Sequence, residues 1–270
     1  MQYQKYINLI QQDYPLLKIS SIIKVGEGDN SKAFHVNENY IFRFPKRKEV
    51  KQQIGRELSV LPKIKSVLNL KIPDFEFISP DINYVGYKKI EGTVLTNKIF
   101  QCLNQKEQTF LQKTIAQFLY QIHSFPVEDL QNCGLEQMNL YEEYSENFEK
   151  AKQFIFPKVS KSKRDIIGRL FTEYLSDENN FNYAPTLVHN DFSKDHILYD
   201  PAKKEITGII DFGDIAFGDP DYDFLYLADE FGENFLIDVL NIISIRIVLF
   251  LKIKFIFLLL RIKFKYFSLV

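Results

Sequence analysis

Two short polar segments, separated by a stretch with the pattern of a β-hairpin, constrain the fold of this chain more than any other feature. The first segment is His189–His196 and the second is Ile210–Asp214. The residues between them are β-branched and apolar runs on either side of an Asp-Pro turn, which predicts two antiparallel strands. Because a hairpin returns its two ends to one place, we expect Asp191, His196 and Asp211 to lie close together.

The chemistry of these three side chains suits phosphoryl transfer. Such a site needs a carboxylate that accepts the proton of an attacking hydroxyl, together with oxygen or nitrogen ligands that hold Mg²⁺ against a triphosphate. The alternative is that each motif is an ordinary turn, because Asp and Gly are common in turns. The order and spacing of the two motifs together favour the functional interpretation.

The first 90 residues have mainly the pattern of strands. Apolar and β-branched runs at Lys18–Val25, Tyr40–Phe44 and Tyr84–Ile90 are separated by turn residues, as in an antiparallel sheet. Arg47–Leu61 has helical composition, and we expect Pro62 to end or kink that helix.

After residue 92 the apolar period becomes helical. Lys106–His123 is predicted as an amphipathic helix, and Tyr141–Phe156 and Arg164–Leu175 as two more. The face of the first helix is formed by Phe110, Leu111, Ile115, Phe118, Leu119 and Ile122. The fold class is therefore α+β, with a sheet plus helix followed by a mainly helical part that carries the hairpin.

The net charge of −1 hides two unlike parts of the chain. Residues 1–238 hold 28 basic and 35 acidic side chains, whereas residues 239–270 hold six basic side chains and none that is acidic. The near-neutral total gives no nucleic-acid signature, and the acidic body suits a cationic small molecule. We therefore expect no nucleic-acid partner. We also expect a monomeric protein.

The tail 239–270 differs in composition from the rest, since 23 of its 32 residues are apolar and it has no Gly or Pro. Three explanations remain open: a helix on a membrane surface, a core helix, or a shift of the reading frame that replaced the original C-terminus. We favour the third, because composition changes abruptly at that point. Basic residues interrupt the tail every few positions, so we expect no stable membrane insertion.

Cys102 and Cys133 are the only cysteines, and two cysteines at that spacing build neither a disulfide framework nor a metal site. The first 17 residues contain Asp13 and Pro15 and lack the apolar run of a secretion signal. Both observations favour a cytoplasmic protein.

The motifs around the hairpin also resemble a known family. His189-Asn190-Asp191, Ile209–Asp214 and Gly218–Phe224 are similar to the aminoglycoside phosphotransferases, and most closely to the 2''-O-phosphotransferases. The similarity runs from about residue 18 to about residue 237. It implies a two-lobed, kinase-like fold with a nucleotide-binding lobe at 1–90 and a catalytic and acceptor lobe at 93–238.

By this resemblance Asp191 is the catalytic base, and His196 and Asp211 are the ligands of Mg²⁺. Most relatives carry Asn at the position of His196, and an imidazole is a softer ligand than Mg²⁺ prefers. For Asp214 and the acidic residues at 219–223, the alternative is a structural role, in which they anchor the metal-binding loop.

The resemblance implies that the N-terminal part binds ATP or GTP. Gly26, Gly28, Asn30 and Ser31 would form a loop over the phosphates, although a Gly-x-Gly turn between strands is also an ordinary hairpin turn. Arg43 stands where the family has a phosphate-binding Lys, and it keeps the charge with a larger, forked group.

Glu57 matches the helix Glu that orients the phosphate-binding cation. Residues 86–92 match the hinge, where Tyr87, Lys88 and Ile90 would contact the purine. A bulky aromatic such as Tyr87 resembles the members that favour GTP, and the choice between ATP and GTP stays open.

By the resemblance, the carboxylates that would bind the acceptor are Asp229, Glu230 and Glu233. The alternative interpretation is that they are solvated charges on a helix surface. The sequence thus predicts a phosphotransferase that moves a γ-phosphate to a hydroxyl of an aminoglycoside and confers antibiotic resistance. Two alternatives are a kinase for another small alcohol, and a catalytically impaired nucleotide-binding remnant because of Arg43 and the altered C-terminus.

Overall fold

The computed structural model describes residues 2–28 and 30–243. The tail assigned above to 239–270 falls largely outside these residues. Packing divides the described chain into two compact units. Unit 1 comprises 2–111, 128–135 and 194–215, and unit 2 comprises 112–127, 136–193 and 216–243. These units interleave along the sequence, whereas the lobes predicted above follow sequence order.

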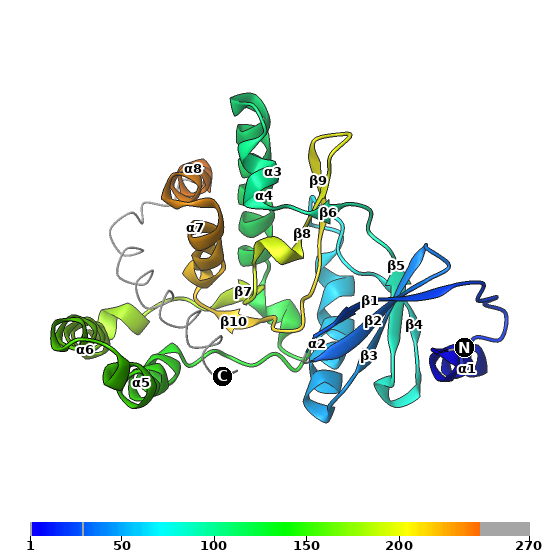
Figure 1. Cartoon of the computed structure of the whole chain (residues 1–270), viewed down its shortest axis with the longest axis horizontal. Helices are drawn as coiled ribbons and strands as arrows, with labels where there is room; N and C mark the ends of the chain where they lie inside the picture. The colour runs from blue at the N-terminus through cyan, green and yellow to red at the C-terminus, as the bar shows by residue number, and fades with distance from the viewer. Residues whose placement is uncertain (1, 29, 244–270) are drawn as a thin grey trace. The chain divides into compact units, whose positions relative to one another are not determined.

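Unit 1 is built around a five-stranded antiparallel sheet with the order β1-β2-β3-β5-β4 (Figure 1). The strands are β1 (Ile22–Glu27), β2 (Ser31–Val36), β3 (Tyr40–Pro45), β4 (Phe75–Ile78) and β5 (Val85–Lys88). The predicted strand at 18–25 therefore begins later, at Ile22, and Gly26 belongs to β1 rather than to the turn. Asn37 and Glu38 have φ of 52° and 61°, the left-handed backbone that tight hairpin turns require.

Strand alternation gives the sheet two chemically different faces. Phe42 and Phe44 of β3 pack with Phe34 and Tyr84 into an aromatic core against α1 (Gln4–Asp13). Helix α1 was not predicted from the sequence. Because successive side chains point to opposite faces of a strand, Arg43, between Phe42 and Phe44, lies on the other face.

That other face packs against α2 (Lys48–Ile64), whose Val50 and Ile54 form a cluster with Val85 of β5. The helix was expected to end or kink at Pro62, but it continues to Ile64. A proline so near the end of a helix disturbs only its last turn.

A second, three-stranded sheet of unit 1 has the order β6-β8-β9. Its strands are β6 (Thr93–Val94), β8 (Ile197–Asp200) and β9 (Glu205–Ile209), and α3 (Asn97–Gln101) follows β6. The predicted hairpin is therefore present as β8 and β9, which pair in antiparallel register.

Helix α4 (Gln105–His123) passes from unit 1 into unit 2. Its predicted apolar face is buried from Leu111 to Ile122, but Phe110 is 52% exposed. Phe110 precedes Leu111 by one residue, which turns it about 100° away from the stripe.

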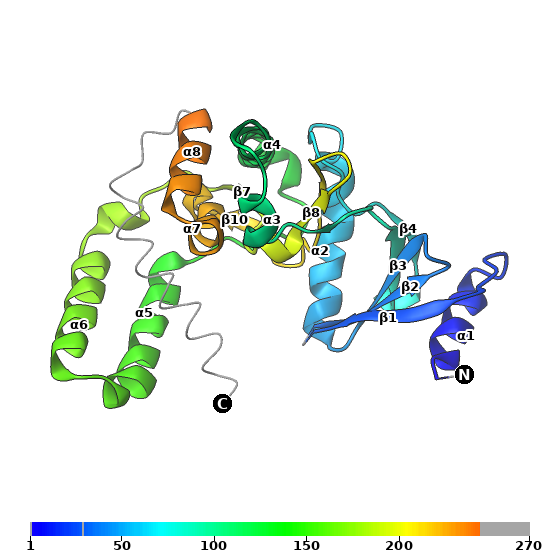
Figure 2. The same ribbon diagram turned by 45° about the horizontal axis from the view of Figure 1, so that its top comes forward.

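Unit 2 contains the antiparallel pair β7 (Thr186–Val188) and β10 (Ala216–Gly218), followed by α7 (Leu225–Phe231) and α8 (Glu233–Ile243). Helices α5 (Leu140–Lys150) and α6 (Lys161–Ser176) lie side by side in both ribbon views (Figure 2). The helix predicted at 141–156 changes to a π-helix at Ala151–Ile155.

The core under α5 and α6 is aromatic. Tyr144 packs edge to face on Tyr174, and Phe148 stacks on Phe171 with 4.7 Å between the ring centroids. These large side chains fill the space between the two helices and fix them against each other.

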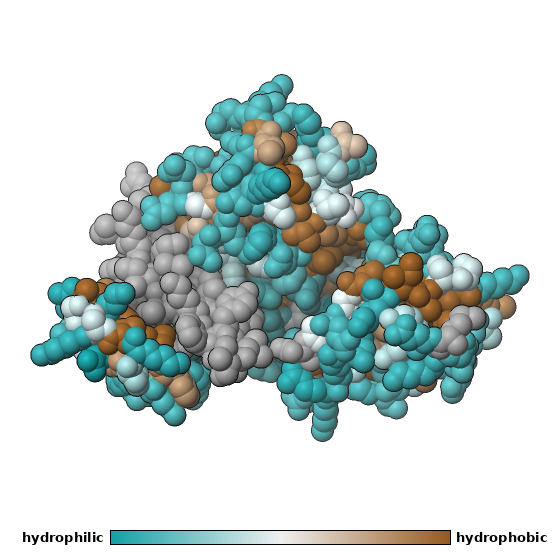
Figure 3. All heavy atoms as spheres, viewed as in Figure 1, coloured by the Kyte–Doolittle hydropathy of each residue, from teal (hydrophilic) through white to brown (hydrophobic). Residues whose placement is uncertain are grey.

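The described surface is mainly polar on the face shown in Figure 3, where brown, apolar groups form separate areas among teal, hydrophilic ones. Exposed apolar side chains include Ile23 and Val25 on β1 and Phe154 and Ile166 in the α5–α6 region. Within residues 2–28 and 30–243, none of the helices is both long and apolar enough to cross a membrane.

Candidate active site

An ion pair between β3 and α2 is the centre of the candidate site in unit 1. Arg43 Nη1 lies 2.8 Å from Glu57 Oε2, and the Glu57 side chain is fully buried. Strand alternation directs Arg43 toward α2, and Glu57 points from the helix toward the sheet. The structure thus pairs Arg43, the predicted phosphate-binding cation, with Glu57, the residue predicted to orient it.

The β8–β9 hairpin brings His196 and Asp211 together. His196 directly precedes β8, Asp211 comes two residues after β9, and the Ile210 N–H donates to the His196 carbonyl at 3.0 Å. His196 Nε2 is 3.5 Å from Asp211 Oδ2, and Arg43 Nη2 is 3.5 Å from Asp211 Oδ1. Unit 1 therefore gathers the predicted phosphate-binding and metal-binding side chains into one cluster.

The charges in this cluster influence one another strongly. Burial raises the pKa of the Glu57 carboxyl, and Arg43 acts in the opposite direction. Burial disfavours the charge of Arg43, but Glu57 and Asp211 outweigh it and raise the pKa of the guanidinium. Arg43 therefore stays cationic, and two carboxylates share its charge.

Mg²⁺ fits the pair formed by His196 and Asp211. Within residues 2–28 and 30–243, three or more His, Cys, Asp or Glu side chains are nowhere arranged to hold a metal ion. Mg²⁺ usually binds one or two protein ligands and completes its shell with phosphate oxygens and water. The Asp211 side chain is 52% exposed, so its oxygens are accessible to such a shell.

The predicted phosphate loop lies between β1 and β2, and two cationic side chains that follow β3 hold it. Lys46 Nζ donates to the Gly28 carbonyl at 2.7 Å, and Arg47 Nη2 donates to Asn30 Oδ1 at 2.8 Å. Gly26 pairs with Ala33 across the strands. Neither cation was predicted to hold this loop, and their position directly after β3 was the available signal.

Ser31, the first residue of β2, has an unsatisfied group. Ser31 Oγ is buried, and among the described residues no atom hydrogen-bonds to it. A buried hydroxyl without a partner costs free energy.

The predicted purine-binding residues lie on and after β5. Tyr87 is 5% exposed and packs edge to face on Phe75, and burial raises its pKa to about 12. It pairs with Ile41 in the same register that pairs Arg43 with Val85, so Tyr87 and Arg43 share a face of the sheet. Lys88 is exposed, and Ile90 is buried.

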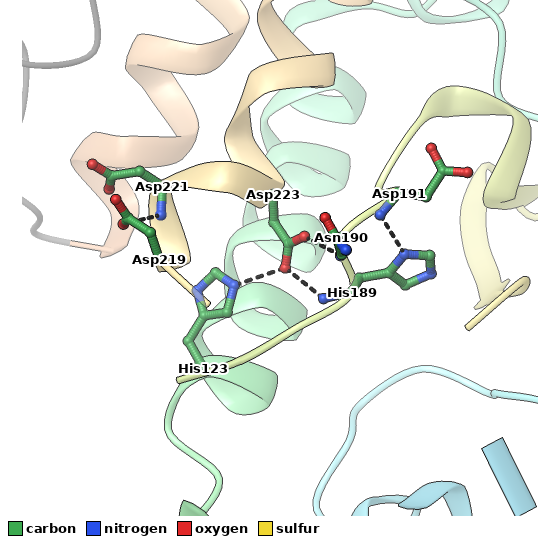
Figure 4. Close-up of polar contacts among 7 residues, drawn as sticks. All are labelled: His123, His189, Asn190, Asp191, Asp219, Asp221 and Asp223. Carbon is green, nitrogen blue, oxygen red and sulfur yellow. Dashed lines mark hydrogen bonds and ion pairs between the residues drawn. The ribbon is translucent and has the colours of Figure 1, made fainter. Parts of the chain in front are cut away.

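In unit 2, Asp191 follows β7 in a loop held by a buried carboxylate (Figure 4). Asp223 accepts the backbone N–H of His189 at 2.9 Å and that of Asn190 at 2.8 Å. His123 Nε2 lies 2.9 Å from the same carboxylate. Asn190 has a φ of 66°, and these contacts hold the strained backbone directly before Asp191.

Sequence reasoning missed His123 and only suggested an anchoring role for the acidic segment 219–223. Asp219 caps the segment by accepting the Asp221 N–H at 3.1 Å, and Asp223 is fully buried. A histidine that ends an amphipathic helix and the last carboxylate of the acidic segment were the available signals, but each is common in proteins of other function.

The predicted acceptor carboxylates lie on two consecutive helices of unit 2. Asp229 and Glu230 are on α7, and Glu233 begins α8. Asp229 and Glu233 are exposed, whereas Glu230 is partly buried.

Comparison with curated proteins gives a distant relative. The chain is 22% identical over 204 residues to the uncharacterized protein YcbJ of Bacillus subtilis (strain 168). The match covers 72% of this chain and 64% of that protein, so the chain spans less than two thirds of the length of this relative.

Solved structures are more similar. The GDP and kanamycin complex of APH(2'')-IIIa superimposes with a TM-score of 0.88 at 29% identity, covering 95% of this chain and 90% of that one. The streptomycin–ATP complex of APH(2'')-IIa gives a TM-score of 0.76 at 26% identity, covering 94% and 86%. The predicted kinase-like α+β fold is therefore confirmed.

The family assignment follows from the extent of the sequence match. Residues 21–244 match the phosphotransferase enzyme family, which is most of the chain and includes both polar segments around the β8–β9 hairpin. The resemblance inferred from the sequence is confirmed, and the chain belongs to the phosphotransferase enzyme family.

Proposed function

We propose that this phosphotransferase moves the γ-phosphate of ATP or GTP to a hydroxyl of an aminoglycoside. The observation that carries the proposal is the cluster of Arg43, Glu57, His196 and Asp211 in unit 1. It combines a cation that would bind phosphate with a carboxylate and an imidazole that would hold Mg²⁺, and phosphoryl transfer requires a phosphate-binding cation and metal ligands. The similar structures that hold GDP with kanamycin and ATP with streptomycin support the choice of donor and acceptor.

Each residue has a defined part in the proposed reaction. Arg43, held by Glu57, binds phosphate oxygens through its guanidinium. His196 and Asp211 hold Mg²⁺, which offsets the negative charge of the phosphates when it is bound. Asp191 orients the acceptor hydroxyl and accepts its proton as the hydroxyl oxygen bonds to the γ-phosphorus. The bond from that phosphorus to the bridging oxygen breaks, and ADP or GDP leaves.

The acceptor is proposed to be cationic because of the charge of the chain. Residues 1–238 carry seven more acidic than basic side chains, which favours the approach of a polycation. Asp229, Glu230 and Glu233 are the proposed acceptor-binding carboxylates. A kinase for another small alcohol is the alternative with the same chemistry.

A second candidate, a nucleotide-binding protein without turnover, is favoured by one observation. Arg43 directs one nitrogen to Glu57 and the other to Asp211, so the guanidinium already contacts the proposed metal ligand. A lysine at this position, with a single ammonium, would make fewer simultaneous contacts.

The test is a panel of aminoglycosides and uncharged alcohols, each assayed with ATP and with GTP in the presence of Mg²⁺. Phosphorylation of aminoglycosides alone supports the proposal, and phosphorylation of an uncharged alcohol alone supports the alternative. Nucleotide binding without turnover on any acceptor, with turnover gained in Arg43→Lys, supports the second candidate.

A further inference from the structure

The loop that contains Asp211 contacts α2 through residues that have no role in the proposed reaction so far. Asp211 has a φ of 64°, in the left-handed region that residues other than glycine adopt uncommonly, Asp more often than most. Asp211 Oδ1 lies 3.5 Å from Arg43 Nη2, and Asp211 Oδ2 lies 3.5 Å from His196 Nε2. A charge-assisted hydrogen bond is usually shorter, about 2.7–2.9 Å.

A shorter contact joins α2 to the same loop three residues later. Gln53 Nε2 donates to Asp214 Oδ1 at 2.9 Å. Between Asp211 and Asp214 the chain is anchored by Phe212, which is fully buried. The loop is therefore held by a buried ring in its middle and by a hydrogen bond from α2 at its end.

Glu57 lies against the loop as well. A Cβ atom added at Gly213 would lie 3.8 Å from Glu57 Oε1 and 3.6 Å from Asp211 Oδ1. Gln53 and Glu57 are four residues apart on α2, so they lie on one helical face. One face of α2 thus orients Arg43 through Glu57 and contacts the loop of Asp211 through Gln53.

We infer that Gln53 is a positioning residue that sets the metal-binding loop through Asp214 and so places the Asp211 carboxylate relative to Arg43. This inference rests on the proposed function, because it assigns to Asp211 the binding of a divalent cation. Its consequence is that loss of the Gln53 amide weakens metal binding in the nucleotide complex without weakening metal-free nucleotide binding.

The chain offers a matched control for this test. Gln52 is the neighbouring residue of the same type on the same helix, and it is exposed. Gln53→Ala and Gln52→Ala in the full chain change helix propensity equally but differ in the contact to Asp214. The measurements are Mn²⁺ affinity by electron paramagnetic resonance in the presence of ATP or GTP, and nucleotide affinity by calorimetry without metal.

We expect Gln53→Ala to weaken Mn²⁺ binding about tenfold, the scale of a lost hydrogen bond to a charged group. Gln52→Ala should match the wild type. Metal-free nucleotide affinity and melting temperature should be equal in the two variants, which separates positioning from general destabilisation.

An exchange of the two groups tests the hydrogen bond itself. Gln53→Glu alone places two carboxylates together and should weaken Mn²⁺ binding more than Gln53→Ala does. Adding Asp214→Asn restores a donor and an acceptor at the same total charge, so the double variant should recover most of the affinity. Equal Mn²⁺ affinity in Gln53→Ala and Gln52→Ala, or no recovery in the double variant, overturns the inference.

Failure of the proposed function has a different signature. If the wild-type protein holds no Mn²⁺ together with either nucleotide, and Asp211→Asn behaves like the wild type, the loop carries no metal ligand and both proposals fall. If the wild type binds Mn²⁺ and Asp211→Asn does not, the metal-binding role of Asp211 is supported. The Gln53 variants then decide separately whether Gln53 is a positioning residue.

Discussion

The two units hold their candidate catalytic residues in different ways. In unit 1, polar and charged side chains contact one another, and Asp211, the most accessible of them, lies 3.5 Å from both Arg43 and His196. In unit 2, the fully buried carboxylate of Asp223 holds the backbone before Asp191 through N–H groups at 2.8 and 2.9 Å. Side-chain pairs can exchange partners when a ligand arrives, whereas backbone hydrogen bonds to a buried group keep one geometry.

The largest effect is expected when the proposed base itself is removed. Asp191→Asn should lower turnover by about a thousandfold, the usual scale for a lost general base, with an unchanged melting temperature, because Asp223 holds the backbone. Steady-state kinetics and thermal unfolding check this. Unchanged turnover would mean that Asp191 is not the base.

Removing the anchor in unit 2 should instead destabilise the fold. Asp223→Ala leaves two backbone N–H groups and His123 without their shared acceptor, and a buried unsatisfied group costs roughly 1–3 kcal/mol. We expect the free energy of unfolding to fall by about 4 kcal/mol in urea titrations. Asp165→Ala, at an exposed site on α6, is the control, and an equal effect in both would refute the anchoring role.

In unit 1, Arg43→Met should affect both stability and binding. It leaves the fully buried Glu57 without its cation, which should lower the free energy of unfolding by about 3 kcal/mol. The affinity of the protein for a nucleoside triphosphate should fall, while its affinity for the nucleoside alone should stay the same. Calorimetry measures both affinities. Arg169→Met on the exposed surface of α6 should do neither.

The smallest effect concerns Glu27, which lies at the start of the phosphate loop beside three lysines. Hydrogen bonds from Lys24, Lys46 and Lys32 lower the pKa of its carboxyl to about 2. A lowered pKa in the folded state means that the stabilisation is complete above pH 4.5 and is lost as the pH falls toward 2. The difference in urea midpoint between the wild type and Glu27→Gln should therefore be present at pH 6 and vanish toward pH 2; a constant difference would contradict the ion pairs.

Much of the fold could be predicted from local patterns. The β8–β9 hairpin and α4 follow from alternation and from the 3.6-residue period, which act over a few residues. Helix α1 was missed because its stabilisation comes from packing of Tyr6 and Ile10 on the aromatic face of the sheet, and a short helix has little stability by itself. The helix at 141–156 was predicted in its position, but its change to a π-helix was not.

The residues of the candidate site that belong to sequence motifs could be predicted. Contacts between residues far apart in the sequence could not. The sequence by itself determined the family, the α+β class, the residues proposed for phosphate and metal, and the acidic character of the body. Only the tertiary structure decided that Gln53 contacts Asp214, 161 positions away, and that His123 contacts Asp223, 100 positions away. The physical reason is that such contacts depend on how whole helices pack against loops, and no local pattern of residues encodes that packing.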